Sequence, residues 1–146
     1  MEISCAAAIT LPLAEEKLQD YLHQFLQLLG YPDRTLSLYF TNDHEIQALN
    51  HRYRDQDKPT DALAWSYWEE DPDGELLGEI VISIDRIKAQ AEANHLSEEE
   101  ELLRLLAHSC AHVVGYDHER SPEEARQMLA IEIEMLNKVG LTNIYA

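Results

Sequence analysis

Three histidines in the last third of the chain, His108, His112 and His118, follow one another at a spacing that suits a metal ion. Helical residues four apart lie on one face, so His108 and His112 can both reach an ion at about 2.0 to 2.1 Å. Gly115 is expected to end that helix and let the chain turn back, which brings His118 to the same ion. Three neutral imidazoles leave a coordination position open. The sequence therefore predicts a catalytic metal site at a helix end, with Zn²⁺ the first candidate and nickel or copper also compatible.

The same histidine spacing occurs in the metzincin proteases, whose pattern is H-E-x-x-H-x-x-G-x-x-H. Their glutamate is the general base, and here Ser109 stands in its place and cannot take up a proton at neutral pH. Met128 and Met135 are expected to pack within the last helix, so no Met-turn is indicated. Cys110 is expected to be a small buried hydrophobic residue rather than a ligand or nucleophile. Peptide hydrolysis is disfavoured, and a zinc peptidase or another metallohydrolase is kept as an alternative.

The net charge of the chain bears on which partners it can bind. Acidic residues outnumber basic ones 28 to 11, which gives a formal net charge of −17. Such a charge repels phosphate backbones at long range, so a broad nucleic-acid surface is disfavoured and binding to DNA is not expected. Because salt screens charges beyond about 8 Å, a local basic cleft remains compatible with this balance. Arg52, Arg54 and Lys58 are the candidates for it.

The length of 146 residues suits a single domain covering residues 1–146. Cys5 and Cys110 lie far apart, which does not indicate a disulfide framework and fits a reducing compartment. The N-terminus has no basic residue before Lys17 and therefore does not resemble a signal peptide. No apolar run approaches a membrane span. We expect a soluble, cytoplasmic protein with no membrane partner.

The elements that must position the histidines alternate in type. Apolar spacing predicts a helix over residues 13–29, stopped by Gly30, and a short helix from Asn42 to about Tyr53. Alternating residues predict a strand over 35–40, and stretches 62–68 and 76–83, joined by the turn sequence DPDG, predict an antiparallel hairpin.

The rest of the chain is expected to be helical, over 85–94 and in segments that open at Ser97 and Ser121. Glu100 and Glu124 follow these serines by three residues, so each start reads as a capping box. The fold class is therefore α+β: a small mixed β-sheet of three to four strands packed against about five helices.

At this point the chain resembles the YbeY-type bacterial endoribonucleases. Their pattern H-G-x-L-H-L-x-G-Y-D-H is similar to the segment from His108 to His118, which reads HSCAHVVGYDH. Their pattern L-N-x-x-Y-R-x-x-D-K-P-T-D-V-L-S-F is similar to residues 49–65, and a weaker match is Gly78-Glu79-Ile80. Ser109, Ala111 and Trp65 depart from the family's residues.

The resemblance implies a metal-dependent endoribonuclease specific for single strands. Its expected substrate is ribosomal RNA, near the 3′ end of the small-subunit RNA, and its expected role is in ribosomal RNA maturation and ribosome quality control. The ribosome or small-subunit proteins are the expected partners. Arg54, which matches the family's arginine, is the expected catalytic residue and would hold the scissile phosphate.

Other residues have smaller expected roles. Arg52 and Lys58 are candidates for additional phosphate contacts, and Asp117 is expected either to orient an imidazole or to cap the turn. A non-catalytic ribosome-assembly factor with a structural metal is the second alternative. Structural zinc usually has four protein ligands, and the sequence offers three.

Overall fold

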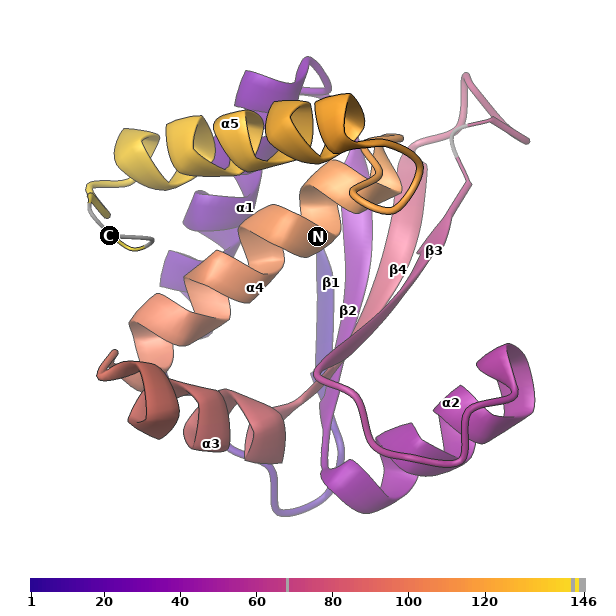
Figure 1. The fold of residues 1–146 in the computed structure, drawn as a ribbon, viewed down its shortest axis with the longest axis vertical. Coiled ribbons are helices and arrows are strands. Elements are labelled where there is room, and N and C mark those ends of the chain that lie inside the picture. The colour runs from indigo at the N-terminus through magenta and orange to yellow at the C-terminus, as the bar shows by residue number, and fades with distance from the viewer. Residues whose placement is uncertain (68, 143, 145–146) are drawn as a thin grey trace.

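A computed structural model describes residues 1–67, 69–142 and 144 (Figure 1). Its centre is a mixed sheet in the order β1-β2-β4-β3. The strands are β1 (Glu2–Cys5), β2 (Thr35–Thr41), β3 (Ala62–Ser66) and β4 (Leu76–Ser83). β1, β2 and β4 run parallel, and β3 pairs antiparallel with β4 as the outer strand. The predicted α+β class is confirmed.

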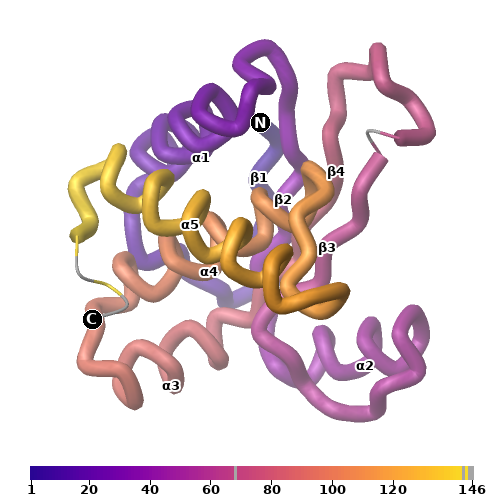
Figure 2. The backbone as a smooth tube through the Cα atoms, turned by 45° about the horizontal axis from the view of Figure 1, so that its top comes forward, coloured from indigo at the N-terminus to yellow at the C-terminus, as the bar shows by residue number. Residues whose placement is uncertain are grey.

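Within the described residues, five helices cover the sheet unequally. They are α1 (Glu15–Leu29), α2 (Asp43–Arg54), α3 (Ile84–Asn94), α4 (Glu98–Val113) and α5 (Pro122–Lys138). α4 crosses one face of the sheet, and α1, α3 and α5 pack around it, as a second view also shows (Figure 2). α2 lies apart from this group, beside β3 and β4 (Figure 1).

Strand alternation divides the apolar residues between the two faces of the sheet. Leu38, Phe40 and Ile80 are fully buried in the large core beneath α4. Leu63 and Val81 point to the other face, where Ile46 of α2 covers them in a small second core. β3 therefore has one side toward α4 and the other toward α2.

Most predicted elements are present. The hairpin of β3 and β4 is confirmed, and β3 ends at Ser66; Trp68, which the prediction included, lies outside the described residues. The start of α4 has the full capping box of Ser97 and Glu100. The start of α5 has only half of one: Ser121 accepts from the Glu124 amide, but the Glu124 carboxylate accepts from the Ser121 hydroxyl instead of its backbone amide.

Within the described residues, the structure contains no helix that is both long enough and apolar enough to cross a bilayer.

Candidate active site

The last turn of α4 sets the positions of the three histidines. Leu105, Leu106, Cys110 and Val113 are buried as predicted, which leaves His108 and His112 on the flank of the helix. The helix ends at Val113, and Gly115 follows with a φ of 111°, a left-handed conformation that glycine adopts without strain. The Tyr116 amide donates to the Ala111 carbonyl at 3.1 Å and closes the turn. The chain therefore reverses and returns His118 toward the helix.

Contacts between α4 and β3 hold the two walls of the site together. The Ser66 hydroxyl donates to the Val113 carbonyl at 2.5 Å. Gly78 of the neighbouring strand leaves room for this approach, because a Cβ there would lie 2.8 Å from Cγ1 of Val113 and would also clash with the Trp65 carbonyl. The glycine of the weaker Gly78-Glu79-Ile80 match thus has a packing reason.

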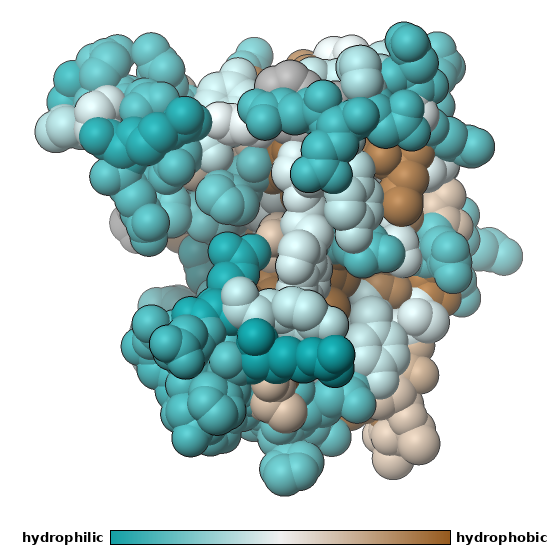
Figure 3. All heavy atoms as spheres, turned by 90° about the vertical axis from the view of Figure 1, so that its right-hand side faces the viewer, coloured by the Kyte–Doolittle hydropathy of each residue, from teal (hydrophilic) through white to brown (hydrophobic). Residues whose placement is uncertain are grey.

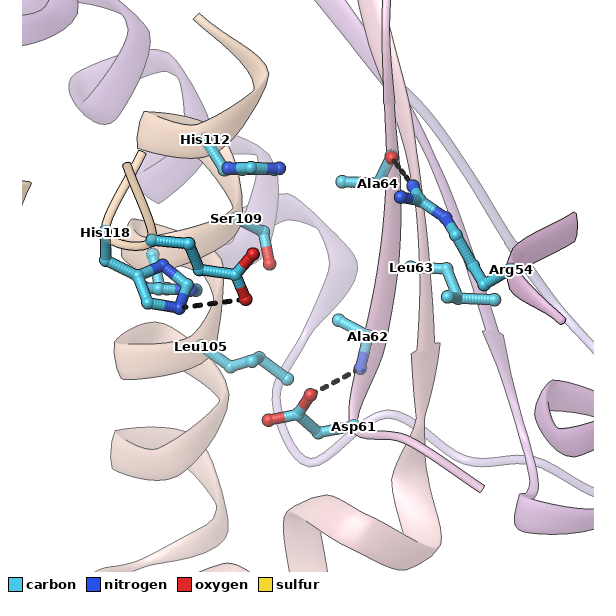
Figure 4. A pocket seen from close by; sticks show the side chains of 11 residues that line it. Arg54, Asp61, Ala62, Leu63, Ala64, Leu105, Ser109, His112 and His118 are labelled. Carbon is cyan, nitrogen blue, oxygen red and sulfur yellow. Dashed lines mark hydrogen bonds and ion pairs between the residues drawn. The ribbon is translucent and has the colours of Figure 1, made fainter. Parts of the chain in front are cut away.

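A cavity of about 270 Å³ opens between α4 and β3 (Figure 4). It brings together the predicted catalytic residue and the three predicted metal ligands: Arg54, His108, His112 and His118. The rings of His108 and His118 lie 5.2 Å apart, centroid to centroid. Two carboxylates that the sequence reasoning did not select, Asp61 and Glu119, line the same cavity.

The Nδ1 atoms of His108 and His112 each have a hydrogen-bond partner within the protein. His108 Nδ1 lies 2.7 Å from Glu132 Oε1, and His112 Nδ1 lies 3.1 Å from the Tyr116 carbonyl oxygen. A carbonyl oxygen and an ionised carboxylate only accept, so each Nδ1 carries the hydrogen. In the neutral rings the lone pair is then on Nε2, which is the arrangement that metal-ligating histidines adopt. The donor chemistry of this pair fits a metal ion.

Glu132 is a third carboxylate that the sequence reasoning did not select. It lies on α5, 24 positions beyond His108, and is only 5 % exposed. A signal for it existed: Met128, Glu132 and Met135 follow one another at helical spacing, and Met128 and Met135 are buried. An acidic residue within a buried stripe requires a partner, since an unpaired buried charge is costly.

His118 is the outermost of the three histidines. Half of its side chain is exposed, 49 %, and its Nε2 lies 3.8 Å from Glu119 Oε1. Among the described residues, no three or more His, Cys, Asp or Glu side chains are placed to hold an ion as they stand.

Arg54 forms the opposite wall. It is the last residue of α2, and its Nη2 donates to the Ala64 carbonyl of β3 at 2.8 Å (Figure 4). This bond fixes the guanidinium over the edge strand and uses one of its five N–H donors. Arg52 and Lys58, the other basic candidates, do not line the cavity.

Asp117 caps the turn after α4. Its Oδ1 accepts from the Glu119 amide at 2.8 Å, and its Oδ2 pairs with Arg120 Nε at 3.3 Å. The bond from the Glu119 amide is the main reason that the pKa of Asp117 lies below its ordinary value. Of the two roles considered for this residue, its contacts are those of the turn cap.

Comparison with known proteins places these residues in a family. The sequence model described as Endoribonuclease YbeY matches residues 5–140. The chain belongs to this family.

Relatives agree in sequence and in fold. The Endoribonuclease YbeY of Aquifex aeolicus is 39% identical over 126 residues, which cover 86% of this chain and 84% of that protein. The Endoribonuclease YbeY of Colwellia psychrerythraea is 40% identical over 116 residues, covering 77% and 73%. A solution structure of a Thermotoga maritima protein superposes with a TM-score of 0.61 at 27% identity, over 94% of this chain and 90% of that one.

Membership in the YbeY family gives the chain an enzymatic activity. The protein is a hydrolase, an endoribonuclease that cuts phosphodiester bonds within RNA, and RNA is its substrate. The family is one of metalloenzymes in general terms, which agrees with the imidazole donors of the cavity. The peptidase alternative is thereby set aside.

Proposed function

We propose that residues 1–146 form one domain that acts as a metal-dependent, single-strand-specific endoribonuclease in ribosomal RNA maturation. The substrate is the 3′ end of the small-subunit RNA, and the enzyme also serves ribosome quality control in the cytoplasm, in contact with the ribosome or its small-subunit proteins. One observation carries the proposal: three imidazoles and a guanidinium line one cavity in a chain of the YbeY family.

In this proposal His108, His112 and His118 hold the ion, for which Zn²⁺ is the first candidate and nickel and copper are also compatible with three imidazoles. When bound, the ion supplies Lewis-acid activation of the phosphodiester. Glu132 and the Tyr116 carbonyl hold two of the rings by their Nδ1 hydrogens, at 2.7 and 3.1 Å. The two inner histidines are thus preorganised, and His118 completes the set from the loop.

Arg54 holds the scissile phosphate. One guanidinium donor is bound to Ala64, and the remaining donors are available for phosphate oxygens across the cavity from the histidines. A fixed cation at this place offsets the negative charge that builds up on the phosphoryl oxygens in the transition state. This role needs charge and a planar fork together, which distinguishes arginine from lysine.

The geometry opposes a purely structural metal. Structural zinc sites are closed by four protein ligands, whereas the three histidines here border an open cavity. Ser109, in the position of the metzincin glutamate, is only 4% exposed and has no carboxylate. Both features agree with a site that admits a phosphodiester.

The test uses a labelled oligoribonucleotide that carries the 3′ end of the small-subunit ribosomal RNA. The protein is expected to cut it as a single strand, to spare its duplex, and to lose activity when a chelator is added. Adding back zinc should restore cutting. Equal cutting of single strand and duplex, or full activity in chelator, would contradict the proposal.

A further inference from the structure

A second hollow lies on the other side of the edge strand β3. Its volume is about 420 Å³, and it is lined by Leu49, Tyr53, Trp65, Tyr67, Glu79 and Val81. Residues 62–64 of β3 line the catalytic cavity, while Trp65, the next residue, lines this hollow. Figure 3 shows the side of the molecule that carries α2 and the β3 edge: polar residues cover most of it, and its outline is hollowed between an upper and a lower part.

Two of the three aromatic residues that line this hollow, Tyr53 and Trp65, are in contact with each other. The rings of Tyr53 and Trp65 meet edge to face, with centroids 5.7 Å apart and planes at 85°. Tyr53 is 52% exposed, although tyrosine rings usually bury their apolar surface. The Tyr53 side chain therefore keeps about half of its surface open to solvent, while Trp65 is partly buried against the small second core.

Arginines border both rings. The Arg52 guanidinium lies 5.2 Å from the Tyr53 centroid, and the Arg54 guanidinium lies 6.0 Å from the Trp65 centroid. Arg54 also lines the catalytic cavity, so it joins the two hollows across the edge strand. In a chain with a net charge of −17, two arginines next to two aromatic rings form a local group of positive charge.

We propose that Tyr53 and Trp65 form a stacking site for one unpaired nucleobase of the RNA, next to the phosphate that Arg54 holds. The inference rests on the proposed single-strand endoribonuclease activity and adds a binding site to it. A base stacks on an aromatic face whatever its identity, and single-strand binding proteins combine such faces with cations that follow the backbone. A base within a duplex is covered on both faces, so this site selects single strands.

The acidic neighbour favours a base over a phosphate in this hollow. Glu79 lines it, and its Oε2 accepts from the Tyr67 hydroxyl at 2.9 Å. A fixed carboxylate repels a phosphate, whereas it can accept a hydrogen bond from the amino edge of a base. The phosphates are thus directed toward Arg54 and Arg52 and the base toward the rings.

The first experiment measures cleavage of a short single-stranded oligoribonucleotide by Tyr53→Ala. Removing the ring is expected to raise KM on the order of ten-fold with little change in kcat, because stacking is lost while the cavity is intact. Tyr53→Phe keeps the ring and should return KM toward that of the wild type. Leu129→Ala, a truncation of another exposed apolar side chain, 43% exposed on α5, is the matched control and should not alter KM.

The second experiment measures binding without cleavage. In a Trp68→Phe background Trp65 is the only tryptophan, so its fluorescence reports directly on this hollow. With chelator present, the single-stranded oligoribonucleotide should quench Trp65 saturably and its duplex should not. A series of oligonucleotides with an abasic residue at each position should show one position that weakens binding to the wild type but not to Tyr53→Ala.

The outcomes separate this inference from the proposed function. Saturable quenching without cleavage in zinc would refute the proposed function and support the stacking site. Cleavage with an unchanged KM in Tyr53→Ala, or quenching by duplex as strong as by single strand, would overturn the stacking site and leave the proposed function standing.

Discussion

His108 and Glu132 are joined by a 2.7 Å contact between Nδ1 and Oε1 that ties the end of α4 to the middle of α5. Glu132 is buried, while the side chain of His108 is 36% exposed and borders the cavity. The carboxylate fixes the direction of the ring and directs its other nitrogen away from α5. The geometry of the site therefore depends on a helix that contributes no residue to the cavity lining.

Removing that carboxylate should weaken metal binding. Glu132→Ala leaves the His108 ring free to rotate, and loss of such an outer partner typically lowers metal affinity by about 10- to 100-fold. Competition with a chromogenic chelator measures the change. Glu134→Ala, an exposed carboxylate on the same helix, is the matched control. Equal affinities for the two variants would show that Glu132 does not position His108.

Removing one imidazole should remove the ion. His112→Ala leaves two histidines at the cavity, and elemental analysis of the purified variant is expected to show loss of bound metal. The fold should be retained, because His112 is exposed and its ring contact is to the backbone of Tyr116. His23→Ala, an exposed histidine of α1, serves for comparison. A His112→Ala protein with the metal content of the wild type would disprove the ligand assignment.

Arg54→Ala should separate catalysis from metal binding. The loss of a fixed transition-state donor typically lowers kcat about 100- to 1,000-fold. The metal content should stay constant, because Arg54 is not one of the proposed ligands and its hydrogen bond is to the Ala64 carbonyl. Arg54→Lys should recover only part of the rate, since it keeps the charge without the fork. Single-turnover cleavage is the measurement, with Arg126→Ala on α5 as control. Undiminished cleavage by Arg54→Ala would remove this residue from the mechanism.

Acid should weaken the contact between α2 and α3. Arg86 donates to both carboxylate oxygens of Asp43, and with the Ser83 hydroxyl it holds the pKa of Asp43 below its ordinary value of 3.8. At pH values between the lowered pKa of Asp43 in the folded protein and its ordinary value of 3.8, the unfolded chain binds more protons than the folded one. The stabilisation is therefore complete above pH 3.8 and is lost as the pH falls below it.

Urea unfolding at several pH values checks this assignment. Asp43→Asn is expected to lower the free energy of unfolding by about 1 kcal/mol at neutral pH. In this variant the free energy of unfolding should also fall less steeply as the pH is lowered. Asp20→Asn, an exposed aspartate of α1, should leave the slope as it is in the wild type. A slope in Asp43→Asn equal to that of the wild type would contradict the pairing.

The two cysteines should differ in reactivity. Burial raises the pKa of the Cys110 thiol to about 12, so almost no thiolate forms at neutral pH, whereas Cys5 is exposed. Alkylation of the folded protein followed by mass spectrometry is expected to modify Cys5 alone. Both residues should react after unfolding in urea. Rapid modification of folded Cys110 would contradict its packing in the core.

The sequence allowed prediction of the features that depend on local spacing. The helix end at Gly115, the hairpin of β3 and β4, and the buried position of Cys110 all follow from neighbours within a few residues. β1 was not predicted, because Glu2–Cys5 is short and mostly exposed and gains its structure by pairing with β2, more than 30 residues away. Local patterns carry no information about such a partner.

The same limit explains what the site prediction omitted. Glu132 acts through a histidine 24 positions earlier, and Asp61 reaches the cavity because β3 crosses α4. The hollow of Tyr53 and Trp65 requires the end of α2 to lie against the edge strand. These are tertiary relationships, which spacing along the chain does not reveal.

The most direct test of the account is a zinc titration of chelator-stripped protein, followed by cleavage of a single-stranded oligoribonucleotide at each step. Activity should rise from background and level off when zinc reaches the molar amount of protein, and His112→Ala should stay inactive throughout. Cleavage by the stripped wild type at its full rate, or by His112→Ala, would contradict a catalytic ion held by His108, His112 and His118.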